Sequence, residues 1–120
     1  MGIIENRINE LRKELVKNGA IVLQNPKCGT STITKIDDKI HYKRGNTDFT
    51  LSVELIVKTF NNFHGNKCST VNLAKFDKEY TDNTGAPHCG CTFFMLLMNK
   101  FFGTDILGKG VRGDPYYINL

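Results

Sequence analysis

The sequence predicts an α+β protein, in which an N-terminal helix and a small antiparallel sheet precede three further helices and a β-hairpin. Apolar residues recur at helical spacing in three segments, and they alternate with polar residues between residues 20 and 45. The chain has 120 residues, of which 40% are hydrophobic and 23% are charged. This composition is typical of a globular domain and excludes a disordered or collagen-like chain.

The first expected element is an amphipathic helix over residues 4–17. The members of its apolar stripe recur at spacings of four, three and four residues: Ile4, Ile8, Leu11 and Leu15. Gly19 suits the position just after the helix. A narrow stripe of this kind can pack on the rest of the chain, or it can pack on its own copy in a second subunit, which would give a homodimer.

Short strands are expected next. Residues 20–24 are apolar and end at Asn25-Pro26, and residues 31–36 and 39–43 alternate on either side of an Asp37-Asp38 turn. This pattern predicts a small antiparallel sheet over residues 20–45. We therefore assign residues 1–48 to an N-terminal helix and β-hairpin extension.

The remainder of the chain is expected to be mainly helical. Ser52 and Ser69 are suitable N-caps for two helices, of which the second extends to Tyr80. A third helix runs from about His88 to Phe102 and is apolar on every face. Two strands, Ile106–Leu107 and Tyr116–Leu120, are expected after it.

Three helices followed by a β-hairpin, with a short extended piece between the first two, resemble a winged helix-turn-helix domain over residues 49–120. The resemblance rests on the order of these elements and on the basic, Gly-rich hairpin loop from Gly108 to Pro115, which is expected to be open and flexible. It implies DNA binding, and in that family the third helix enters the major groove. Few polar side chains of the third helix could reach bases here: His88, Thr92, Asn99 and Lys100.

We expect a small non-enzymatic DNA-binding protein that contacts phosphates, which fixes its position on DNA without reading sequence. The cations expected to make these contacts are Lys43, Arg44, Lys100, Lys109 and Arg112. The net charge is +4, but residues 49–120 carry seven basic and six acidic side chains. The alternative is therefore a protein-binding inhibitor or assembly module that uses the apolar third helix and the C-terminal hairpin.

One string suggests thiol chemistry. Residues 25–31, Asn-Pro-Lys-Cys-Gly-Thr-Ser, are similar to the active-site loop of thioredoxin-fold arsenate reductases, which implies a nucleophilic thiolate at Cys28. Thr32 stands where that family has an arginine, and the β-branched residues that follow predict a strand where the family has a helix. A turn is the simpler interpretation.

A second hypothesis concerns zinc. The candidate ligands are His88, Cys89, Cys91, Cys28 and Cys68. Structural zinc sites usually have two chelating pairs, and this sequence has one short Cys-x-Cys pair. We therefore expect buried core cysteines, with no metal and no cofactor.

The N-terminal segment lacks the basic start, apolar middle and cleavage site of a secretory signal. The longest apolar run, Phe93 to Met98, is far shorter than the ~18 residues of a membrane span. We expect a cytoplasmic protein, with reduced cysteines and no membrane segment.

Overall fold

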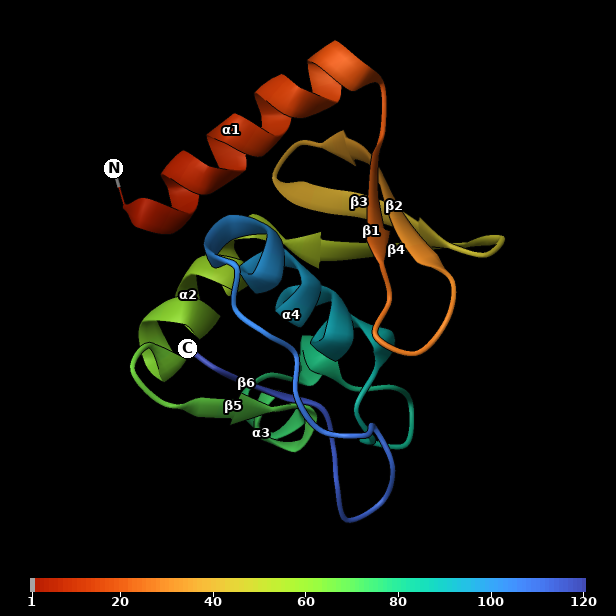
Figure 1. Ribbon diagram of the computed structural model, residues 1–120, viewed down its shortest axis with the longest axis vertical. Coiled ribbons are helices and arrows are strands. Elements are labelled where there is room, and N and C mark those ends of the chain that lie inside the picture. The colour runs from red at the N-terminus through yellow and green to blue at the C-terminus, as the bar shows by residue number, and fades with distance from the viewer. Residues whose placement is uncertain (1) are drawn as a thin grey trace. The chain divides into compact units, whose positions relative to one another are not determined.

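An N-terminal helix and a four-stranded antiparallel sheet form the first of two units (Figure 1). The computed structural model describes residues 2–120, and its units are Met1–Lys58 and Thr59–Leu120. The predicted α+β class is confirmed, because the described residues form four α-helices, this sheet and a second, two-stranded sheet. The boundary expected between residues 48 and 49 lies inside a strand, whereas the chain passes from one unit to the next inside α2 (Val53–Phe63).

The strands of the first sheet lie side by side in chain order: β1 (Ile21–Gln24), β2 (Thr30–Ile36), β3 (Lys39–Arg44) and β4 (Thr47–Ser52). The expected hairpin is confirmed, since β2 and β3 are joined at Asp37-Asp38 and pair antiparallel. The sequence does not predict β4, because Arg44-Gly45-Asn46 has the composition of a closing loop. In the structure Gly45 takes a φ of 59° and turns the chain directly into this strand.

Helix α1 (Ile3–Asn18) packs its apolar stripe within its own unit. It contacts β1 and β2, and Ile4, Ile8 and Leu11 are at most 2% exposed. Gly19 ends the helix in the left-handed conformation, with a φ of 80°. The predicted helix is confirmed, and three of its four stripe residues pack within the chain, while Leu15 is half-buried.

Helix α2 begins as predicted, because Ser52 Oγ accepts a hydrogen bond from the Leu55 N–H at 3.2 Å. Strand β5 (Lys67–Ser69) and helix α3 (Thr70–Phe76) follow it. A capping box between Ser69 and Asn72 fixes the start of α3.

The second predicted helix ends earlier than expected. Its apolar spacing extends to Tyr80, but α3 stops at Phe76 and a 3-10 turn, η1 (Lys78–Tyr80), follows. The cause is Asp77, whose backbone is extended and whose side chain accepts the Glu79 N–H at 2.8 Å, so that it begins a new turn.

Helix α4 (Cys89–Phe102) is the central core helix that the sequence predicts. Its N-cap is His88, whose Nδ1 accepts the Gly90 N–H at 3.1 Å, and Gly103 ends it with a φ of 70°. All six residues from Phe93 to Met98 are buried.

Strand β6 (Tyr117–Asn119) pairs antiparallel with β5, with Ile118 opposite Cys68. The expected strand at Ile106–Leu107 does not form; Leu107 alone makes a bridge, to Tyr117. The physical reason is the positive φ of Gly108 and of Gly110, which interrupts the extended conformation directly after Leu107.

Candidate nucleic-acid interface

The predicted wing is an ordered hairpin, which we call the C-terminal hairpin (residues 107–117). Leu107 and Tyr117 exchange two backbone hydrogen bonds, of 2.8 and 3.0 Å. Val111 and Asp114 exchange another two, of 3.2 and 2.9 Å, around a two-residue tip. Arg112 therefore lies at the tip of a hydrogen-bonded hairpin.

The glycines of the C-terminal hairpin make it tight, which corrects the expectation of an open and flexible loop. A methyl group on Gly108 would collide with the backbone of Pro115, and one on Gly110 would collide with the ring of Tyr116. Both glycines also have a positive φ. They are needed because the two arms of the hairpin approach each other closely.

Lys109 and Arg112 are exposed on this hairpin. Within residues 2–120 neither of them forms an ion pair, although Asp114 lies in the same hairpin. Their charges are therefore available to a ligand without the loss of an internal salt bridge.

The other predicted contacts are distributed over both units. Lys100 lies in the last turn of α4, in the second unit. Lys43 and Arg44 lie in β3 of the first unit, and Lys43 forms an ion pair with Asp48 at 3.7 Å. The five predicted cations are thus not assembled within one unit, and only Lys109 and Arg112 share one loop.

Three of the four polar side chains predicted to face DNA from helix α4 make contacts within their own segment, and the fourth, Lys100, is exposed. His88 caps the helix, Thr92 Oγ1 donates to the Cys89 carbonyl at 3.0 Å, and Asn99 Nδ2 donates to the Thr104 carbonyl at 3.0 Å. The helix therefore lacks a row of outward-facing polar side chains of the kind that reads base edges. It also buries its apolar run, which leaves the C-terminal hairpin as the remaining surface of the protein-binding hypothesis.

The loop around Cys28 is a turn between β1 and β2, and not the start of a helix. Ser31 Oγ donates to Asn25 Oδ1 at 2.6 Å, and the Asn25 N–H donates to the Gly29 carbonyl at 3.0 Å. The strand that the β-branched residues predict is confirmed as β2. Cys28 is exposed and lacks the helix dipole that activates such a thiolate.

Two of the other cysteines belong to the core. Cys68 and Cys91 are fully buried, and burial raises the pKa of each thiol to about 12. The Cys91 thiol donates to the Tyr80 carbonyl, with Sγ at 3.2 Å from the oxygen. The structure places no set of three or more His, Cys, Asp and Glu side chains around a possible metal position in residues 2–120.

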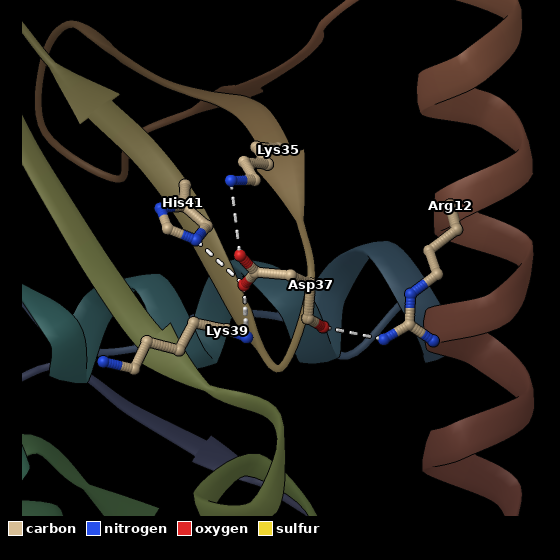
Figure 2. A network of polar contacts seen from close by, with 5 residues as sticks. All are labelled: Arg12, Lys35, Asp37, Lys39 and His41. Atoms are coloured by element: carbon tan, nitrogen blue, oxygen red, sulfur yellow. Dashed lines mark hydrogen bonds and ion pairs between the residues drawn. The ribbon is translucent and has the colours of Figure 1, made fainter.

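A polar network on the first unit was not predicted from the sequence (Figure 2). The Asp37 carboxylate accepts the Lys39 N–H at 2.9 Å and lies 2.9 Å from His41 Nε2 and 3.5 Å from Lys35 Nζ. These contacts, led by the hydrogen bond from the Lys39 N–H and followed by that from His41, hold the pKa of Asp37 well below its usual range. One feature of the sequence could have predicted this network: an aspartate at the start of a turn between two strands of alternating polarity.

A depression of about 370 Å³ adjoins this network. Its lining residues come from β2, β3 and β4: Thr34, Lys35, His41, Tyr42, Asp48, Phe49 and Thr50. We call it the sheet depression. Its lining residues include hydroxyl, ammonium, imidazole and carboxylate groups.

Comparison of the chain with models of protein families, with curated proteins and with solved structures finds no match in any of the three. Separately, no helix in residues 2–120 combines the length and the hydrophobicity that crossing a membrane requires.

Proposed function

We propose that the protein binds DNA by contacting backbone phosphates with its C-terminal hairpin. Lys109 and Arg112 carry this proposal, because both are exposed on a hydrogen-bonded hairpin and neither has an internal ion-pair partner among the described residues. Phosphate neutralisation by such cations is the dominant source of affinity for DNA. An ordered scaffold also reduces the conformational entropy that binding would otherwise cost.

The order of elements supports the same proposal. Helix α2, strand β5, helix α3 and helix α4 precede the C-terminal hairpin, and β5 pairs with β6, which begins at the hairpin's last residue, Tyr117. A winged helix-turn-helix domain has this sequence of helices and strands, and its hairpin is the wing. On this basis we propose a winged-helix-like arrangement for residues 49–120, which include all of α2.

The binding should be independent of DNA sequence. The His88, Thr92 and Asn99 side chains make local hydrogen bonds, so the proposed contacts are those of the hairpin with phosphates. The proposal implies a cytoplasmic protein, which is consistent with four free cysteines.

A second candidate is a protein-binding module that uses the same hairpin. Leu107 and Val111 are 37% and 48% exposed, and they lie beside the two cations. Apolar side chains surrounded by charge are typical of a small protein interface. A protein partner would bury these two residues, whereas phosphate contacts do not require that.

Fluorescence anisotropy with a labelled duplex of mixed sequence, over a range of salt concentrations, tests the proposal. We expect Lys109→Ala with Arg112→Ala to weaken binding and to reduce the salt slope by roughly one to two units, about one per lost phosphate contact. Lys75→Ala with Lys78→Ala removes the same charge from exposed positions outside the hairpin and should change the slope less. Absence of binding by the wild type at low salt would overturn the proposal.

A homodimer stays a prediction: Ile4, Ile8 and Leu11 of the stripe that suggested it are buried within the chain, and Leu15 is half-buried. Light scattering of the wild-type chain measures the assembly state directly.

A further inference from the structure

Three polar side chains form a row across the outer face of the first sheet. In the strand register Lys35 lies opposite His41, and His41 lies opposite Thr50. Directly opposite side chains on neighbouring strands are about 5 Å apart at Cβ, so these three groups are neighbours. The opposite face of the same strands carries the buried Ile40, Tyr42 and Leu51.

A β-bulge produces this row. Ile33 pairs with Tyr42 and Lys35 pairs with His41, so Thr34 is the extra residue in β2. Without the bulge, strict alternation would direct Lys35 to the same face as the buried Ile33. The bulge places Thr34 and Lys35 together on the exposed side, which is the way in which bulges re-aim side chains beside functional sites.

Asp37 orients the imidazole of this row. His41 Nε2 lies 2.9 Å from Asp37 Oδ1, and the other ring nitrogen, Nδ1, lies away from that carboxylate (Figure 2). When the ring is cationic, Nδ1 carries a proton and is a donor. Among the described residues Nδ1 has no hydrogen-bond partner, and the side-chain hydroxyls of Thr34 and Thr50 have none.

The two carboxylates near the row both form ion pairs. Asp37 is paired with His41 and with Lys35, whose ammonium lies 3.5 Å away and keeps further N–H groups for a ligand. Asp48, in the wall of the sheet depression, is paired with Lys43 at 3.7 Å. Donors therefore dominate the groups that the sheet depression offers to a ligand.

We propose that the sheet depression binds a phosphate group, with Thr34, Lys35, His41 and Thr50 as the donors. A tetrahedral oxyanion accepts hydrogen bonds on several sides, as this set requires, and charge-assisted bonds from an ammonium and an imidazolium are the strongest of their kind. A metal ion does not fit, because a lysine ammonium offers no lone pair. A nucleotide or a nucleic-acid backbone can supply this phosphate.

This site lies in the first unit and is independent of the C-terminal hairpin. A nuclear magnetic resonance titration of the ¹⁵N-labelled full chain with inorganic phosphate, against sodium chloride of equal ionic strength, tests it. We expect saturable shifts at the four donor residues. Lys35→Ala should weaken phosphate binding about tenfold, which is the loss of one charge-assisted hydrogen bond.

Lys39→Ala is the matched control. It removes the same charge next to the same turn, but the Lys39 side chain extends away from the Asp37 carboxylate (Figure 2). Its affinity for phosphate should equal that of the wild type, whereas Thr50→Val should weaken binding through the lost hydroxyl. Shifts that do not saturate, or equal affinities of the Lys35 and Lys39 variants, would overturn the proposal.

Two further arms identify the source of the phosphate. Both arms use the Lys109→Ala, Arg112→Ala variant, which lacks the hairpin cations. Tighter binding of oligothymidylate than of adenosine monophosphate then indicates a nucleic-acid backbone, and equal binding indicates a free nucleotide; both results support the site. The hairpin variant Lys109→Ala with Arg112→Ala should bind inorganic phosphate at the sheet depression as the wild type does. This variant therefore distinguishes the two proposals: it can lose DNA binding by the hairpin while phosphate binding at the sheet depression is kept.

Discussion

A single aspartate connects the turn between β2 and β3 to three neighbouring segments. The Asp37 carboxylate binds the Lys39 N–H and His41 and lies near Lys35, while its backbone carbonyl accepts a hydrogen bond from Arg12 of α1 at 2.9 Å (Figure 2). These contacts fix the turn against both of its strands and against the helix. They favour the ionised form of the carboxyl group, and its pKa is accordingly lowered.

Replacement of this carboxylate, Asp37→Asn, should lower the free energy of unfolding at neutral pH. Because the folded-state pKa lies below the ordinary value of 3.8, the contribution is fully present above that value and is lost as the pH falls below it. Urea unfolding of both proteins at a series of pH values from 7 downward measures the difference. The difference in the free energy of unfolding between the two proteins should decrease as the pH falls through about 4. A difference that stays constant over this range would contradict the lowered pKa of Asp37.

At the level of elements, the sequence predicts those structures whose signals are local. Helical spacing and caps such as Ser52 and Ser69 predict the helices, and alternation around Asp37-Asp38 predicts the central hairpin. Strand β4 is missed because Gly45 can either close a sheet or continue it, and the outcome depends on pairing with β3. The polar row is missed because the bulge at Thr34 has no signature in the sequence and changes the face on which Lys35 lies.

The packing of α1 leads to a prediction that separates folding from assembly. Ile8 is fully buried, so Ile8→Ala should reduce the free energy of unfolding by about 2–5 kcal/mol, through lost burial and the cavity that remains. Val16→Ala, in the same helix but 87% exposed, is the control and should change it by less than about 0.5 kcal/mol. Urea unfolding gives both values. Light scattering should show the same particle mass for both variants as for the wild type, and a smaller mass for the Ile8 variant alone would instead place this stripe between subunits.

At the scale of the whole molecule, the predicted cations illustrate why a site is harder to derive than a fold. Lys43 and Arg44 belong to the first unit, while Lys100, Lys109 and Arg112 belong to the second. Composition gives only the net charge of the chain. Which of the charged side chains lie close together depends on the tertiary structure. The C-terminal hairpin is the exception: Lys109 and Arg112 are close in sequence, and the turn chemistry that joins them is itself local.

The four thiols offer a measurement over the whole chain that also tests the expectation of no metal. Cys28 is exposed and should react with a thiol reagent at once in the native protein, and the half-buried Cys89 should follow. Cys68 and Cys91 should react only on unfolding, because both are inaccessible and their raised pKa, about 12, suppresses the reactive thiolate. Kinetics of labelling with and without a chelator separate burial from metal ligation: burial predicts identical traces, whereas a zinc site would release protected thiols and unfold the protein when its metal is removed.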